Sequence, residues 1–254
     1  MPSVYTHYLV ARETYKLLPP DLQESLRPHL SLYFFGAQGA DFCFFYRFAN
    51  PRKRNLGSYL HRKGGYDAFR LLQHFSRRDT ALFAYALGFI THYAVDTVFH
   101  PFVYAVSGKS LLLHSRVEGA LDALYVKKYK DVKTDSFAPF FRKKLTEKET
   151  NALFLYYATV AEHASFPTII KPSFLRAISM FNAYMPLSFS IFGERKPQLI
   201  HALFGKAGTD KKASALFQNT VEKSLSLIGA FCTAKDAHEP LSKALFGKSY
   251  LTGE

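Results

Sequence analysis

The first part of the chain contains an ordered series of histidines and carboxylates whose spacing suits metal binding. On a helix, residues four positions apart point in nearly the same direction, so His92, Asp96 and His100 would share one face. His114 and Glu118 repeat the same spacing further along the chain. Imidazole nitrogen and carboxylate oxygen are both good ligands for zinc. Two such helices packed together could therefore hold two or more ions in one cleft.

A structural role for these side chains is the alternative. A lone histidine on an apolar helix is usually a core or surface residue rather than a ligand. Three titratable side chains in one apolar segment would each need a buried hydrogen-bond partner, and an unpartnered polar group is costly to bury. That cost favours metal binding over three separately satisfied side chains.

The elements that carry these residues are expected to be helical. Helical periodicity dominates the sequence, and neither alternating strand patterns nor internal repeats appear, so we predict an all-α fold, a multi-helix bundle. We expect helices over residues 4–18, 66–75, 80–101, 110–130, 146–166 and 213–233. Residues 32–48 are interpreted as a turn or helix entry, and prolines at positions 167, 172, 186 and 197 are expected to interrupt further helical segments.

Length and composition limit the organisation and the partners. The 254 residues suffice for one domain over 1–254, with the ligand-bearing part in residues 1–130, helices that complete it in 131–254, and a charged candidate linker at 131–148. Two cysteines exclude a disulfide framework and a cysteine-based zinc module. The net charge of +13 favours an anionic partner, such as a phosphate ester, nucleic acid or an anionic membrane surface, without choosing among them.

Residues 80–99 form the most lipid-like segment and are long enough to span a bilayer. His92 and Asp96 within it would be costly in lipid, so we expect a core helix instead. The first residues lack a basic stretch followed by an apolar one, so no secretory signal is predicted. The expected location is therefore cytoplasmic or peripheral to a membrane.

Several stretches together resemble the bacterial zinc-dependent phospholipase C family. They are GAQGADF at residues 36–42, ALGFITHYAVDTVFHPF at residues 86–102, and His114 followed four positions later by Glu118. His7 and His61 also fall in the family's order, and the resemblance covers roughly the first half of the chain. It extends, more distantly, to the fungal single-strand-specific zinc nucleases. It implies an all-helical scaffold around a cluster of zinc ions.

The resemblance implies three neighbouring zinc sites. The first would be held by four residues, of which Asp41 would also be the general base: Asp41, His61, His92 and Asp96. The second would be held by His100, His114 and Glu118, and the third by His7 and Asp96. An amino-terminal Trp completes the third site in secreted relatives, and this chain has no Trp. Removal of Met1 would let the Pro2 amine take that place; otherwise the protein would hold two metals, with the third weak or absent.

The implied activity is hydrolysis of a phosphodiester by metal-activated water, with a phospholipid as the favoured substrate. One alternative is a single-strand nuclease on the same scaffold, although the pair His114 and Glu118 resembles the phospholipase pattern more closely. The other is a non-catalytic protein that retains zinc for folding, in which protein ligands would close every coordination position. No protein partner is implied.

Overall fold

The protein is described by a computed structural model over residues 4–46, 55–129, 145–192 and 206–254. Within these ranges it is helical and contains no strand, which confirms the predicted all-α class. The longer helices are α1 (Val4–Leu17), α5 (Gly65–Ser76), α6 (Thr80–Ser107), α7 (Leu111–Lys128), α9 (Glu147–His163), α10 (Lys171–Phe192) and α12 (Lys206–Asp236). The short ones are α2 (Pro20–Leu26), α3 (Leu30–Gly36), α4 (Leu56–Tyr59) and α13 (Lys243–Phe246), with 3-10 turns at Arg27–His29 and Asp41–Phe45 and a π-helical turn at Leu60–Gly64.

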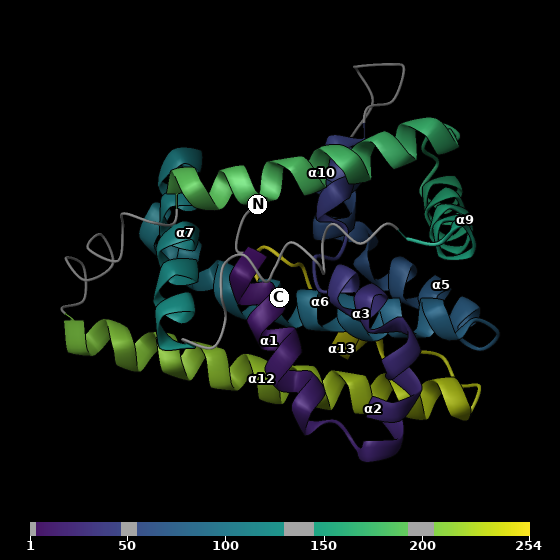
Figure 1. Ribbon diagram of the computed structural model, residues 1–254, viewed down its shortest axis with the longest axis horizontal. Coiled ribbons are helices and arrows are strands. Elements are labelled where there is room, and N and C mark those ends of the chain that lie inside the picture. The colour runs from purple at the N-terminus through teal and green to yellow at the C-terminus, as the bar shows by residue number, and fades with distance from the viewer. Residues whose placement is uncertain (1–3, 47–54, 130–144, 193–205) are drawn as a thin grey trace.

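Helix α6 runs through the middle of the molecule (Figure 1). Around it, α10 crosses above, α12 lies below, and α7 and α9 stand at opposite ends. The helix is capped by Asp79, whose side chain accepts hydrogen bonds from the amides of Ala81 and Leu82 at 2.9 and 3.0 Å. By length and composition α6 could cross a membrane, but 89% of its most apolar window is buried inside the protein. It is the central helix of the core.

Helix α6 also continues beyond Pro101, where the sequence predicted its end, as far as Ser107. A proline inside a helix removes one donor, so the carbonyl of Thr97 loses its usual partner. Gly253, near the end of the chain, packs against this carbonyl so closely that a Cβ there would lie 2.6 Å from the Thr97 oxygen. At the position where the sequence predicted the end of the helix, the segment that contains Gly253 thus packs against α6.

The interpretation of residues 32–48 as irregular was wrong for residues 32–36, which belong to α3. Helix α3 forms because it packs tightly against α6. A Cβ on Gly88 would lie 1.9 Å from the carbonyl oxygen of Tyr33, so only glycine permits this approach. The close packing brings the 3-10 turn that follows α3, with Asp41, next to the histidines of α6.

Other predicted boundaries also shift. Helix α10 includes positions 172 and 186, so these prolines do not interrupt it; position 172 lies in the first turn, where a helix needs no amide donor. Helix α9 begins with the predicted capping box between Thr146 and Glu149. Helix α12 is longer than the predicted 213–233. Position 197 and residues 131–144 of the candidate linker lie outside the described residues.

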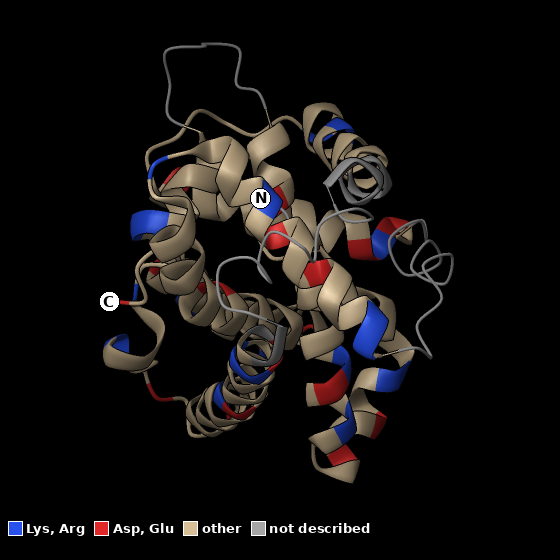
Figure 2. Cartoon of the chain, turned by 90° about the vertical axis from the view of Figure 1, so that its left-hand side faces the viewer, with Lys and Arg blue, Asp and Glu red and all other residues tan. Residues whose placement is uncertain are grey.

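One hydrophobic core contains side chains from both halves of the chain. The hydroxyl of Tyr125 on α7 donates to the carbonyl of Ala213 on α12 at 2.7 Å, and that of Tyr156 on α9 donates to Ala68 on α5 at 3.2 Å. The later helices therefore complete the packing of the earlier ones. Figure 2 shows Lys and Arg spread over several helices of the described chain rather than gathered on one.

Candidate metal centre

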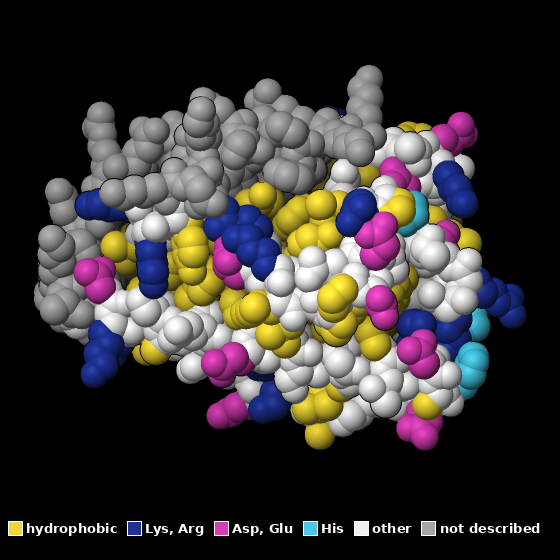
Figure 3. All heavy atoms as spheres, turned by 60° about the horizontal axis from the view of Figure 1, so that its bottom comes forward, with side chains coloured by type: hydrophobic (Ala, Val, Ile, Leu, Met, Phe, Trp, Pro, Cys, Tyr) yellow, Lys and Arg dark blue, Asp and Glu magenta, His cyan; other side chains and the backbone are white. Residues whose placement is uncertain are grey.

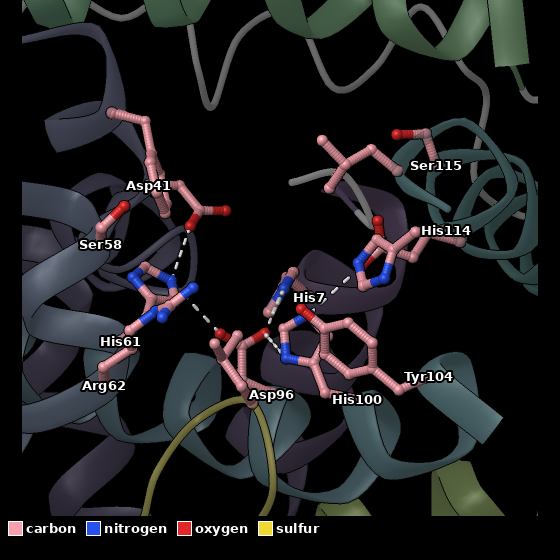
Figure 4. Close-up of a pocket in the computed structure, with 14 residues that line it drawn as sticks. His7, Asp41, Ser58, His61, Arg62, Asp96, His100, Tyr104, His114 and Ser115 are labelled. Atoms are coloured by element: carbon pink, nitrogen blue, oxygen red, sulfur yellow. Dashed lines mark ion pairs between the residues drawn. The ribbon is translucent and has the colours of Figure 1, made fainter. Parts of the chain in front are cut away.

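Most of the side chains singled out in the sequence meet in one pocket. The cavity measures about 370 Å³, and seven of the eight line it: His7, Asp41, His61, Asp96, His100, His114 and Glu118. The eighth, His92, is completely buried beside them. All eight are at most 7% exposed. Figure 4 shows the labelled members of the set converging on the pocket from different helices.

Five separate segments deliver these side chains. His92, Asp96 and His100 lie on α6, one turn apart as the sequence predicted, and His114 and Glu118 lie on α7 in the same register. The remaining residues come from elsewhere in the chain: His7 from α1, Asp41 from the 3-10 turn after α3, and His61 from the π-helical turn. Such π turns occur often at functional sites.

The first group of donors surrounds the carboxylate of Asp96. Its Oδ2 lies 3.4 Å from His61 Nε2 and 3.3 Å from His92 Nε2. Asp41 Oδ1 lies 3.0 Å from His61 Nε2 and 3.9 Å from His92 Nε2. One ligand atom each from His61, His92 and Asp96 lies within 4.8 Å of the others, which is close enough to hold one ion.

His7 borders this first group. Its Nε2 lies 3.4 Å from Asp96 Oδ1, and its ring stacks on that of His92 with centroids 4.5 Å apart. A ligand atom of His7 also lies within 4.8 Å of ligand atoms of Asp41 and His92. His7 thus lies beside Asp96, the partner that the family resemblance implies, and also beside Asp41. Pro2, whose amine was considered for this site, lies outside the described residues.

The second group lies between α6 and α7. Glu118 Oε1 is 3.4 Å from His100 Nε2 and 3.1 Å from His114 Nε2. The rings of the two histidines stack with centroids 5.5 Å apart. These three residues form a further set whose ligand atoms all lie within 4.8 Å of one another. The two groups are adjacent, since His100 Nδ1 lies 3.7 Å from Asp96 Oδ1.

Backbone carbonyls orient two of the imidazoles. His61 Nδ1 donates to the carbonyl of Gly57 at 2.7 Å, and His100 Nδ1 donates to the carbonyl of Tyr250 at 2.9 Å. A carbonyl only accepts, so Nδ1 of each ring carries a proton, and Nε2 faces the pocket; in the neutral ring that Nε2 has the lone pair that can bind a metal. Tyr250 is near the end of the chain and was missed by the sequence analysis, because no local pattern connects it to His100.

Asp122 is a second residue that the sequence analysis missed. Its carboxylate accepts hydrogen bonds from the amide and hydroxyl of Thr6 at 2.8 and 2.6 Å, and from the amide of Tyr5 at 3.3 Å. These bonds tie the first turn of α1 to α7 and so position His7. The signal that could have identified it is its place one helical turn after Glu118.

Burial and neighbouring charge set the ionisation of the group. Burial lowers the pKa of His92 to about 4, which keeps this imidazole in the neutral form that binds metals. Burial also lowers the pKa of His61, but the neighbouring carboxylates of Asp41 and Asp96 outweigh this effect and raise the pKa to about 10. Burial raises the pKa of both carboxyl groups, yet the surrounding histidines outweigh this effect and hold the pKa of both below the ordinary range. Asp41 and Asp96 are therefore ionised.

Unpartnered buried atoms test whether a metal fits. Both ring nitrogens of His92 lack a hydrogen-bond partner among the described residues, and so does Asp96 Oδ2. Leaving such atoms unpaired costs about 1–3 kcal/mol each. They lie in the group of donors that can share one ion, and their imidazole and carboxylate chemistry suits zinc. The residues present fit a zinc centre.

Glycine is required behind this centre. Gly39 has a φ of +52°, and a Cβ at that position would lie 2.2 Å from the ring of His92. A side chain would therefore displace the buried imidazole. This explains why the turn that leads to Asp41 contains glycine at position 39.

Comparison with known proteins gives one family. Residues 6–163, which are more than half of the chain, match the family model described as zinc dependent phospholipase C. No curated protein and no solved structure matches the chain significantly. The matched range runs from α1 to the end of α9 and contains all eight residues of the pocket group, whereas α10, α12, α13 and Tyr250 lie beyond it.

Proposed function

Because the chain belongs to the zinc-dependent phospholipase C family, we propose that it hydrolyses a phosphodiester and that its substrate is a phospholipid, cleaved at the headgroup. The observation that carries the proposal is the concentration of eight buried imidazole and carboxylate side chains around one pocket. A peripheral position at a membrane follows from such a substrate.

For the zinc ions we propose the ligand sets that the family resemblance implies, and the short distances between the donors support them. Four residues would hold the first ion: Asp41, His61, His92 and Asp96. His100, His114 and Glu118 would hold the second, and His7 with Asp96 the third. Zinc, when bound, polarises the phosphate and lowers the pKa of water.

Asp41 is the proposed general base. One of its carboxylate oxygens lies 3.0 Å from His61 Nε2, and the other points into the open pocket in Figure 4. The neighbouring histidines keep the carboxylate ionised despite its burial, so the second oxygen can accept a proton from an attacking water. Arg62 also lines the pocket, and its positive charge attracts a phosphate.

The openness of the pocket favours catalysis over a purely structural role for zinc. A structural zinc site is closed on all sides by protein ligands, whereas a catalytic site keeps a position for water. Here the donors face a cavity that is also lined by Ser58, Tyr104 and Ser115. That space is available to a substrate next to the donors.

The test combines metal content with turnover. Elemental analysis of the purified protein should find two or three zinc ions per chain, and hydrolysis of a phospholipid should stop on chelation and return with zinc. Asp41→Asn should lower turnover at least about a hundredfold, because it removes the proton acceptor, without changing the helical circular dichroism. Asp67→Asn, at an exposed carboxylate on α5, is the matched control and should be fully active.

Each rival function predicts a different result. Zinc that is retained without turnover would show that the protein is a structural zinc protein. Hydrolysis of single-stranded DNA but not of phospholipid would identify the nuclease. A chain that binds no zinc at all would contradict the ligand assignment.

A further inference from the structure

The turn between α6 and α7 exposes apolar side chains at the edge of the metal pocket. Leu111 is 82% exposed and Leu112 is 55% exposed, and every residue from 108 to 112 is exposed. Burying a leucine side chain gains free energy in proportion to the apolar area that is removed from water. Two adjacent exposed leucines therefore favour contact with another apolar phase. We call residues 108–112 (GKSLL) the rim turn.

The rim turn is continuous with the proposed zinc ligands. Leu111 lines the metal pocket and lies three residues before His114. On the other side of the turn, the ring of Tyr104 lies 4.8 Å from that of His114 and 5.8 Å from that of His100. A molecule held by the rim turn is therefore held at the mouth of the pocket.

Part of the polar backbone of the rim turn is satisfied by the protein itself. The amide of Gly108 donates to the carbonyl of Tyr104 at 2.8 Å, and the amide of Ser110 donates to that of Ser107 at 3.2 Å. The hydroxyl of Ser110 accepts from the amide of Leu113 at 3.2 Å and caps α7. Because these groups do not depend on water, the turn can leave water at a lower cost.

Along the sequence, the charged side chains next to the rim turn are all basic. Lys109 is exposed within it, and no Asp or Glu occurs in the sequence between Asp96 and Glu118. By contrast, on the face of the described chain shown in Figure 3, exposed apolar side chains lie among charges of both signs. A cationic apolar turn matches the surface of an anionic bilayer. It does not match a second copy of itself, since a two-fold contact would bring two lysines together.

We propose that the rim turn docks the protein on an anionic lipid surface, with Leu111 and Leu112 inserted among the lipids and Lys109 at the headgroups. This inference rests on the proposed function, because it names the surface from which the phospholipid substrate would enter the pocket. His114 then lies two residues after the membrane anchor along α7.

Vesicle binding tests the inference without requiring turnover. The full-length, zinc-loaded protein is sedimented with vesicles of phosphatidylcholine mixed with phosphatidylglycerol, and separately with phosphatidylcholine alone. Leu112→Ser should weaken binding to the mixed vesicles about tenfold, the equivalent of losing the burial of one leucine. Lys109→Gln should weaken binding to the mixed vesicles only. The control is Leu17→Ser, at a leucine that is 63% exposed at the end of α1, and it should bind like the unmodified protein.

A soluble chromogenic phosphodiester separates this inference from the proposed function. Leu112→Ser should hydrolyse it normally while losing activity on vesicles. If the unmodified protein binds vesicles but hydrolyses neither substrate, the proposed function fails and the docking surface stands. Equal vesicle binding by Leu112→Ser and the unmodified protein would overturn the docking surface. So would a dimer that Leu112→Ser dissociates, because the turn would then be an interface between copies.

Discussion

At the scale of single residues, the proposed metal centre depends on groups that orient the donors as well as on the donors themselves. The carbonyls of Gly57 and Tyr250 accept from His61 and His100 and direct the Nε2 atoms into the pocket. Asp122 acts one step further away, because it holds the first turn of α1 and thereby His7. Such supporting contacts set how precisely a metal site is formed.

Asp122→Ala should therefore destabilise the protein. The substitution removes the acceptor for the buried amide and hydroxyl of Thr6, and we expect the free energy of unfolding to fall by about 2–4 kcal/mol. Urea denaturation followed by circular dichroism measures the change. Asp122→Asn retains one carbonyl acceptor and should lose less. If both variants unfold at the same urea concentration as the unmodified protein, the tie between α1 and α7 is not important for stability.

At the scale of elements, the contact between α3 and α6 delivers Asp41 to the centre. Helix α3 can approach α6 closely only because Gly88 has no side chain opposite the carbonyl of Tyr33. Helix propensity alone would favour alanine at position 88 by about 1 kcal/mol. Packing between the helices opposes propensity here and outweighs it.

Gly88→Ala should therefore destabilise the protein by several kcal/mol, although alanine is the better helix former. The added Cβ would lie 1.9 Å from a backbone oxygen, so one helix must move and Asp41 with it. The matched control is Gly229→Ala in α12, where an added Cβ meets nothing within 4 Å, and it should stabilise the protein by about 0.5–1 kcal/mol. Thermal unfolding of the two variants gives the comparison. Stabilisation in both would contradict the close contact.

At the scale of the whole molecule, the end of the chain completes the centre that the first half begins. The amide of Tyr250 donates to the carbonyl of His61 at 3.1 Å, while its own carbonyl accepts from His100. Its buried ring lies 5.1 Å from that of His61, and Leu251 lines the pocket. Because this segment lies outside the matched range of 6–163, the family region alone does not account for the pocket.

A chain that ends at Lys248 should retain zinc poorly. Loss of Tyr250 frees His61 and His100 from the contacts that orient them, so the metal no longer meets a preformed set of donors. A metal that binds only the folded state raises the melting temperature. Chelation should therefore lower the melting temperature of the full chain by more than that of the shortened one. An equal decrease, with equal zinc content, would show that residues 249–254 do not support the centre.

The sequence by itself determined the all-α class and two of the helical faces that line the pocket. It placed His92, Asp96 and His100 on one face, and His114 with Glu118 on another, because a spacing of four residues has a direct meaning within a helix. It also predicted the capping box of α9 and the core position of α6, since both depend on neighbouring residues and local hydrophobicity.

Only the tertiary structure decided how the separate segments meet. It decided that His7, Asp41 and His61 converge on α6, that Tyr250 and Asp122 support the donors, and that the rim turn borders the pocket. The helix beyond Pro101 and the helical character of residues 32–36 also depend on contacts with distant parts of the chain. Such contacts leave no periodic trace in the sequence, because they result from packing between residues that are far apart along it.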